Sequence, residues 1–407
     1  MNILKYNKNH YLSMLYAFAV GLLCGIGRNL PDEQFVYLGI AVIDFVLIIS
    51  FIILAIKNSR LLKKHLFIYK NEFIIFYIFA LLCSISIFIN GIDKKILTKD
   101  IFEVFKYLLI PFYLTVYSIV YKNNPLILLL SYLLGLLVIG IIALLNPMND
   151  NVEGTIQIFN PNVIGNVLTF SVFFLFFLLV RYSLKYIFLL LLLLVIAFFT
   201  FSKAAWIMIL LSLLIIYLYI ILSKAEFSQK LIINFFIFLP LCYLIFLNYE
   251  LISNLIILKI KATDFNASAS EGGSFSARLA FLKSSMLMFF DNPFFGVGIS
   301  NWEQAHILNK KILFEDFYLD DNPNSAFFYV LSCMGIFCFL IYLIIVSKFL
   351  LYFMKLNVFN YILYTFFALL IISISGNIQL EMLTSYYFWF FYSIYKFEYY
   401  KNENRNS

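Results

Sequence analysis

The sequence predicts an all-α integral membrane protein with about twelve transmembrane helices and one large loop between the ninth and the tenth. Of the 407 residues, 63% are hydrophobic and 13% are charged, whereas soluble domains carry about 45–50% apolar and about 25% charged residues. A soluble core cannot bury such an excess, so much of it must face lipid. The order of the apolar segments and the placement of the basic residues support the same class.

A membrane helix needs about 20 predominantly apolar residues. This requirement, applied with a tolerance of a few residues, predicts spans near 11–27, 35–56, 66–90, 101–121, 125–146, 160–180, 186–202, 204–223, 231–248, 326–347, 357–376 and 381–396. The chain is therefore expected to have three parts. These are an N-terminal bundle of about nine helices (1–248), a large loop (249–325), and the C-terminal helices with a tail (326–407).

The basic residues of the short connections predict the orientation, because cytoplasmic loops carry an excess of Lys and Arg. With the N-terminus inside, the inner side collects Lys5, Lys8, Lys57, Arg60, Lys63, Lys64, Lys122, Arg181, Lys185, Lys224, Lys230, Lys348 and Lys355. The outer turns have fewer cations, offset by acidic residues. Both termini are thus expected inside and the 249–325 loop outside. This sorting by side also argues against nucleic acid as the reason for the net charge of +7.

The large loop has an uneven composition. Residues 263–277 are rich in Ser, Gly and Ala, which predicts a segment without fixed structure. Residues 278–290 carry apolar side chains at helical spacing, which predicts an amphipathic helix at the membrane interface. Gly296 and Gly298 predict a tight turn before Trp302.

Metal chemistry finds no support in the sequence. The five cysteines all fall in apolar spans and lack the spacing of metal ligands. We therefore expect neither a metal nor another cofactor.

Two Asn-Pro-Asn segments each precede an apolar span. Asn is a favoured helix N-cap and Pro suits the first helical position, so Asn160-Pro161-Asn162 and Asn322-Pro323-Asn324 predict helix starts at the outer face. Simple capping explains them. Alternatively, the exposed N–H groups and the positive end of the helix dipole make each start an anion site.

Two cations at the predicted outer face are candidates for binding an anion. Lys203 follows Ser202, a good N-cap, and a cation in a first helical turn is disfavoured unless an anion shares the site. Arg278 is the only arginine of the large loop and could grip phosphate oxygens in bidentate fashion. The alternatives are snorkelling of Lys203 to the surface and simple solvation of Arg278.

Other polar residues are weaker candidates. His306 is the only histidine on the predicted outer side, where a surface position is the alternative, and Asn301 follows the glycine turn. Charges inside spans are costly and also deserve notice, namely Asp44 and the pair Glu103 and Lys106, which could neutralise each other.

Four features, in order, resemble the O-antigen ligase and O-antigen polymerase superfamily of bacterial membrane glycosyltransferases. They are Phe159-Asn160-Pro161-Asn162 with Gly165; Thr200-Phe201-Ser202-Lys203-Ala204-Ala205-Trp206; Arg278 followed by Asn292-Pro293-Phe294-Phe295-Gly296-Val297-Gly298; and Pro323-Asn324-Ser325 before Met334-Gly335-Ile336. The resemblance covers about 160–340, and its Arg to Asn-Pro-Phe-Phe-Gly-Val-Gly block is the most specific part.

The resemblance implies a membrane glycosyltransferase with a GT-C-like fold at the outer face of the bacterial inner membrane. Its members act on glycans carried on undecaprenyl pyrophosphate and need neither a metal nor a nucleotide sugar. Basic residues hold the pyrophosphate while an acceptor hydroxyl attacks the anomeric carbon with inversion. The implied partners are the lipid-linked glycan donor, the glycan acceptor and the bilayer, and a chain-length regulator is a further candidate.

Two departures from the family pattern narrow the expectation. Lys203 stands where the family has arginine, which keeps the charge but loses the bidentate fork. Asn324 stands where ligases carry a histidine, and an amide cannot act as a base, so Asp320, Asp321 and His306 are the nearest outer candidates. We therefore expect a polymerase of lipid-linked repeat units. In this interpretation Lys203, Arg278, Asn324 and Asp321 are catalytic, and Asn160, Asn162, Asn322, Asn301 and His306 bind substrate.

Three alternatives remain. The first is a ligase that transfers the finished glycan to lipid A core, and the second is an inactive relative. The third, from another class, is a small-anion transporter. A transporter would usually show inverted repeats and a site at the membrane midplane, whereas this sequence has no evident repeat and its candidate residues lie at one face.

Overall fold

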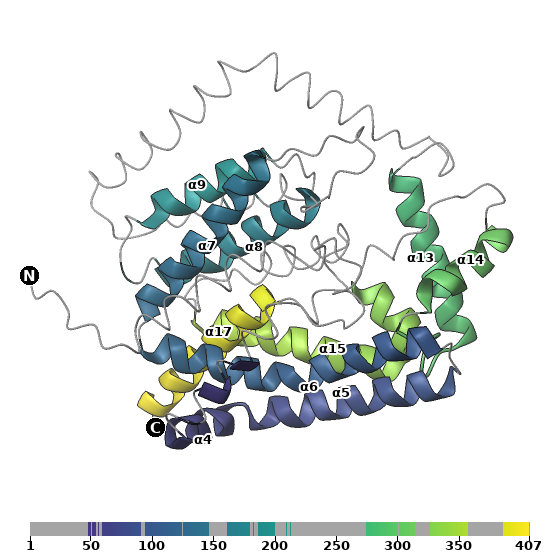
Figure 1. The fold of residues 1–407 in the computed structure, drawn as a ribbon, viewed down its shortest axis with the longest axis horizontal. Helices are drawn as coiled ribbons and strands as arrows, with labels where there is room; N and C mark the ends of the chain where they lie inside the picture. Colours follow the sequence, from purple (N-terminus) through teal and green to yellow (C-terminus); the bar gives the residue numbers. More distant parts are fainter. Residues whose placement is uncertain are drawn as a thin grey trace, which may run out of the picture.

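The computed structural model describes about half of the chain, nearly all of it as helices, and the segments between them lie outside the described residues (Figure 1). The main described ranges are 59–90, 94–123, 125–145, 161–179, 186–199, 274–299, 301–313, 326–356 and 386–406. Their helices are α4 (Ser59–Ile68), α5 (Lys70–Ile89), α6 (Lys94–Asn123), α7 (Pro125–Leu145), α8 (Pro161–Leu179), α9 (Ile187–Phe198), α13 (Ser274–Asp291), α14 (Trp302–Leu313), α15 (Ala326–Leu356) and α17 (Tyr386–Asn406). Every regular element in these ranges is helical, as the sequence predicts.

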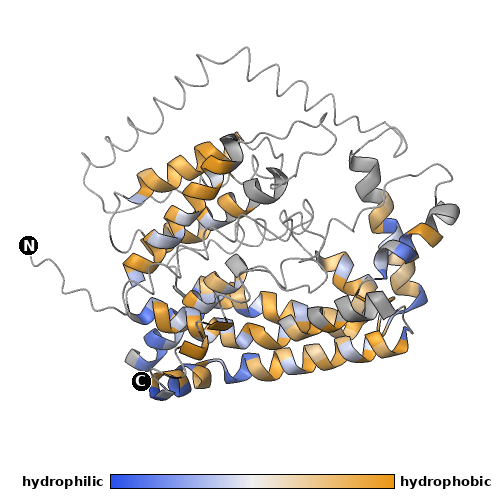
Figure 2. Ribbon diagram, viewed as in Figure 1, coloured by the Kyte–Doolittle hydropathy of each residue, from blue (hydrophilic) through white to orange (hydrophobic). Residues whose placement is uncertain are grey.

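Three of the described helices are long and apolar enough to cross a membrane, at Lys70–Ile89, Pro125–Ile142 and Phe327–Phe353. Figure 2 shows apolar residues along the middle of α5 and hydrophilic ones gathered near its two ends, where α4 and α13 lie. This distribution suits a helix that passes through a bilayer. The membrane class is therefore confirmed, while the total of twelve spans and the side on which each loop lies stay predictions.

The C-terminal helix α17 lies inside the bundle. It packs against α6, α8 and α15, and all its side chains from Phe388 to Phe397 are buried. Its rings interlock with those of other helices; Phe390 stacks on Tyr132 with centroids 4.4 Å apart, and Phe391 lies 5.4 Å from Phe174. Aromatic packing of this kind explains why a helix of low mean hydropathy still occupies the core.

Several boundaries differ from those that hydropathy predicts. Helix α13 begins at Ser274, so the last residues of the segment predicted to lack structure are helical. Helices α4 and α14 were not expected, because a search for long apolar runs overlooks amphipathic helices. In α4, Leu62, His65 and Ile68 are buried on one face.

Candidate functional site

Helix α15 is broken at Gly335, nine residues after its first residue, Ala326. Gly335 has φ 75° and ψ −177°, so the helical hydrogen bond from Ile336 N to Ser332 O is not made there. The loop after α13 supplies the replacement partners. These backbone bonds run from Val297 N to Ser332 O, from Gly298 N to Cys333 O and from Ile336 N to Pro293 O, each 2.9 Å long. The loop thus docks into the gap in the helix.

Two glycines allow this close backbone contact. A Cβ on Gly335 would lie 2.2 Å from the carbonyl oxygen of Phe294, and a Cβ on Gly296 would lie 2.3 Å from the carbonyl carbon of Cys333. Gly296 also has φ 65°, in the left-handed region that glycine adopts at low cost. The predicted glycine turn is confirmed, and the structure adds that it packs against α15.

The C-terminal end of α5 holds the same loop from another side. Ser86 Oγ donates to the carbonyl of Phe295, and Asn90 Nδ2 donates to the carbonyl of Gly296 at 3.1 Å. Asn90 Nδ2 also donates to Ser86 O at 2.8 Å, which orients its side chain. These contacts join residues more than 200 positions apart in the chain.

The end of the loop is fixed by two further hydrogen bonds. Tyr329 OH donates to the carbonyl of Ile299, and Asn301 Nδ2 donates to the carbonyl of Val297 at 2.9 Å. Backbone groups at membrane depth must find partners within the protein. Backbone groups of Pro293 and of residues 295–299 find such partners in α5, in α15 and in the loop itself, which stabilises a segment that is not a helix at the end of the bundle.

An aromatic cluster connects α13 to α14. Trp302 Nε1 donates to Ser285 Oγ at 3.0 Å, and the Trp302 ring stacks on His306 with centroids 4.7 Å apart. Phe281 meets the edges of both rings, at 5.6 Å and 5.2 Å. His306 is 1% exposed, so it lies inside this cluster and not on the loop surface.

The structure describes only some of the predicted site residues. Arg278 lies in the first two turns of α13, and Asn162 lies in the first turn of α8; only their backbones are described. Asn301 and His306 are both within the docked loop and the cluster that follows it. The remaining predicted residues, Lys203, Asn160, Asp321, Asn322 and Asn324, lie outside the described residues.

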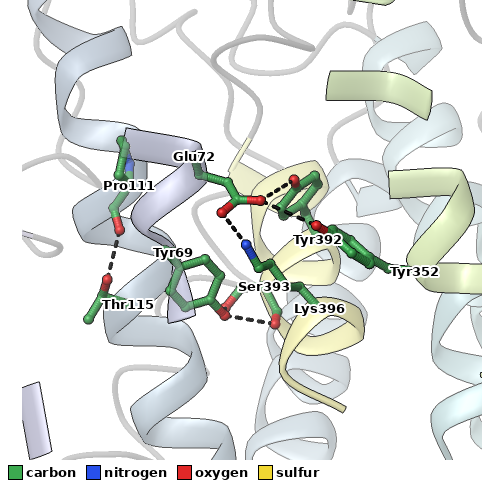
Figure 3. A network of polar contacts seen from close by, with 8 residues as sticks. All are labelled: Tyr69, Glu72, Pro111, Thr115, Tyr352, Tyr392, Ser393 and Lys396. Atoms are coloured by element: carbon green, nitrogen blue, oxygen red, sulfur yellow. Dashed lines mark hydrogen bonds and ion pairs between the residues drawn. The ribbon is translucent and has the colours of Figure 1, made fainter. Parts of the chain in front are cut away.

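A second polar cluster lies at the other end of α5 (Figure 3). The Glu72 carboxylate forms an ion pair with Lys396 of α17 and accepts hydrogen bonds from Tyr392 OH at 2.9 Å and Tyr352 OH at 3.4 Å. Glu72 and Lys396 are 1% and 7% exposed. Both carboxylate oxygens therefore have partners, which makes this cluster a joint between helices and not an open binding site.

Sequence reasoning missed Glu72 and Lys396, although a signal was present. Both fall inside predicted apolar spans, 66–90 and 381–396, and the rule that pointed to Asp44 applies to them equally. From Glu72 to Asn90 is 18 residues of helix, or about 27 Å at 1.5 Å per residue. The ion pair and the docked loop thus mark opposite ends of one membrane helix.

The fold and the loop define an α-helical membrane protein in which a non-helical segment is docked on a broken helix. Residues 187–343 match the family model described as O-antigen ligase. No curated protein matches the chain. The family match supports the resemblance to the O-antigen ligase and polymerase superfamily, whose members are membrane glycosyltransferases. The matched region includes Lys203, Arg278, the docked loop and Gly335.

Proposed function

We propose that the protein polymerises oligosaccharide repeat units carried on undecaprenyl pyrophosphate, as in O-antigen, capsule or a similar surface polysaccharide. The reaction would take place at the periplasmic face of the inner membrane, with both termini in the cytoplasm. The observation that carries the proposal is the family match across residues 187–343. It spans both cations, Lys203 and Arg278, that the sequence places at one face of the membrane.

In this proposal the pyrophosphate is the leaving group. The acceptor hydroxyl oxygen forms a new bond to the anomeric carbon, and the bond from that carbon to the pyrophosphate oxygen breaks with its electron pair. Lys203, Arg278 and the helix starts at Asn160 and Asn322 neutralise the charge that develops on this oxygen. Stabilisation of the leaving group is thus the main contribution of the protein, and neither a metal nor another cofactor takes part.

The acceptor side rests on fewer residues. Asn324 orients the acceptor hydroxyl, and Asp321 accepts its proton as the bond forms. Asn162 adds a polar group at the start of α8. Asn301 and His306 act near the same face. Asn301 forms a hydrogen bond within the docked loop, and the His306 ring stacks on Trp302 of the same helix, α14. Both residues therefore shape the surface that the glycan meets.

A ligase that transfers the glycan to lipid A core is the second candidate, because the matching family is described as O-antigen ligase. The sequence has Asn324 where the superfamily's ligases carry a histidine. An amide cannot serve as a base near neutral pH, and this difference favours the polymerase.

The surface glycan of a strain without this gene distinguishes the two candidates. We expect core bearing a single repeat unit, with the ladder of longer chains lost and restored by the wild-type gene. Bare core together with long glycan on its lipid carrier would overturn the polymerase in favour of the ligase. An unchanged glycan profile would overturn both and leave small-anion transport as the better reading of the sequence.

A further inference from the structure

We infer that the docked segment 293–299 is a mount that sets the position of α13, and that Ser86, Asn90 and Gly335 are positioning residues for glycan transfer. The name mount refers to residues 293–299, which are docked in the break of α15 at Gly335. The inference rests on the proposed function, because Arg278 on α13 is the group whose position it would control. Ser86 and Asn90 lie outside both the family match and the sequence motifs, and Gly335 lies within both without a role of its own.

The mount is hydrogen-bonded from several sides. Three backbone hydrogen bonds tie it to α15, and side chains of α5 and α15 bond three more of its groups. Gly296 and Gly298 are buried. At Gly296 the backbone of α15 lies so close that no Cβ would fit. A loop fixed in this way transmits the position of the membrane helices to whatever it carries.

Helix α13 acts as a long lever between the mount and Arg278. Helix α13 ends at Asp291, and Asn292 N still bonds Met288 O at 3.0 Å, so the helix runs directly into the mount. From Asp291 back to Arg278 is 13 residues of helix, or about 20 Å. A tilt of about 10° at the mount therefore moves Arg278 by about 3 Å. A misplacement of about 1 Å can already slow an enzyme about 100-fold.

Helix α13 is also held to α14 close to Arg278. Phe281, one turn further along α13, lies in the cluster with Trp302 and His306 of α14. Helix α13 ends just before the mount and α14 begins just after it, so the mount joins this pair of helices to the membrane helices. Loosening the mount therefore tilts α13 and α14 together without unfolding them.

The experiment compares two serines of the same helix. Ser86→Ala removes a hydrogen bond to the mount, whereas Ser84→Ala removes only a bond to Ala80 O within α5. Asn90→Asp keeps the shape of the side chain but replaces the N–H donor to Gly296 by an oxygen. Each variant is expressed at full length, and its folded amount is measured by size-exclusion chromatography in detergent.

Two measurements follow for each variant. The surface glycan ladder reports on transfer. The distance between spin labels at Leu282 and Leu340, which are 37% and 50% exposed, reports on the position of α13 relative to α15. Labels attached through bio-orthogonal amino acids leave the native cysteines in place.

The expected result is specific to the mount. Ser86→Ala combined with Asn90→Asp should broaden the label distance and reduce long-chain glycan at least 10-fold at a normal amount of folded protein, while Ser84→Ala resembles wild type. A wild-type distance and a full ladder in the double variant would overturn the inference, as would loss of the ladder without any change in distance. If the double variant misfolds, the single variants carry the same test. Should Arg278→Ala keep its ladder while the double variant shows the broadened distance, the proposed function fails and the mount as a structural joint stands.

Discussion

Replacement of Gly335 by alanine is the sharpest perturbation that the fold offers. The backbone there has φ 75° and ψ −177°, a region that residues with a Cβ avoid at a cost of about 1–3 kcal/mol. The added Cβ would lie 2.2 Å from Phe294 O and 2.5 Å from Phe295 N. Because these are backbone atoms, they cannot turn away, and overpacking adds about 1–3 kcal/mol. The sum is about 4 kcal/mol, or about a thousand-fold in the docking equilibrium of the loop.

Thermal unfolding of the purified protein in detergent measures this cost. Trp302, one of three tryptophans, is buried beside the mount, so part of the tryptophan fluorescence reports on this region. For a chain of 407 residues, a loss of about 4 kcal/mol should lower Tm by roughly 5 °C. The same variant should lose long-chain glycan in cells, because the loop carries α13.

Gly140 provides the matched control in another membrane helix, α7. A Cβ there would meet Ile196 Cγ2 at 2.7 Å, a methyl group on a buried side chain of α9, so α9 would have to shift slightly. Alanine is also favoured over glycine inside a helix by about 1 kcal/mol. Because Gly140 lies in regular helix and its contact is with a side chain and not with backbone, Gly140→Ala should lower Tm less than Gly335→Ala. Equal Tm values for Gly335→Ala and Gly140→Ala would refute the reasoning on the mount.

Three further predictions concern charged groups. Glu72→Gln or Lys396→Met alone leaves one buried charge unpaired and should lower the free energy of unfolding by about 3–5 kcal/mol. The double variant should recover most of the lost Tm. Additive losses of Tm would contradict the role of this ion pair as a joint between helices. Burial, with Lys122 and Lys64 nearby, lowers the pKa of His65 to about 4. Folding therefore favours the neutral imidazole, so stability is full above about pH 6.5 and falls between pH 6.5 and 4, by about 2 kcal/mol at pH 5. His65→Asn should flatten this part of the profile of Tm against pH. An unchanged slope would contradict the assignment of this pH dependence to His65. Arg278→Ala should reduce polymer formation by about 100-fold, as measured from the glycan ladder, and Lys283→Ala on the same helix should not.

Part of this fold follows from composition and local pattern. Hydropathy alone predicts the helices that can cross a membrane, because each depends on a run of apolar residues. The helix after residue 274 and the turn at Gly296 and Gly298 follow from local spacing in the same way. These features need no knowledge of which helices pack together.

The break in α15 could not be predicted by the same means. Gly335 lies within an apolar span, and hydropathy does not distinguish a broken helix from a straight one. The break is stabilised by hydrogen bonds to a loop some 40 residues earlier in the chain, and the ion pair between Glu72 and Lys396 joins residues 324 positions apart. Such pairings depend on helix packing, which a single sequence does not specify.

The candidate site also contains some residues that the sequence identifies and others that only the fold reveals. Arg278 was singled out because it is the only arginine of a loop, and the fold places it on a helix that is held to α14 and runs into the mount. His306 is the only histidine on the predicted outer side and Asn301 follows the glycine turn in sequence, whereas the fold gives both of them contacts within the loop region. Ser86 and Asn90 sit at the end of an ordinary apolar span, so their contacts with the loop appear only in three dimensions.

Polymerisation by the purified protein tests the central claim most directly. The assay supplies the protein in detergent with undecaprenyl-pyrophosphate-linked repeat units, without nucleotide sugar and with a chelator present. We predict chains of two or more repeat units on the lipid carrier, strongly reduced for Arg278→Ala and unchanged for Lys283→Ala. Unaltered single repeat units with the wild-type protein, or transfer seen only after lipid A core is added, would contradict the account.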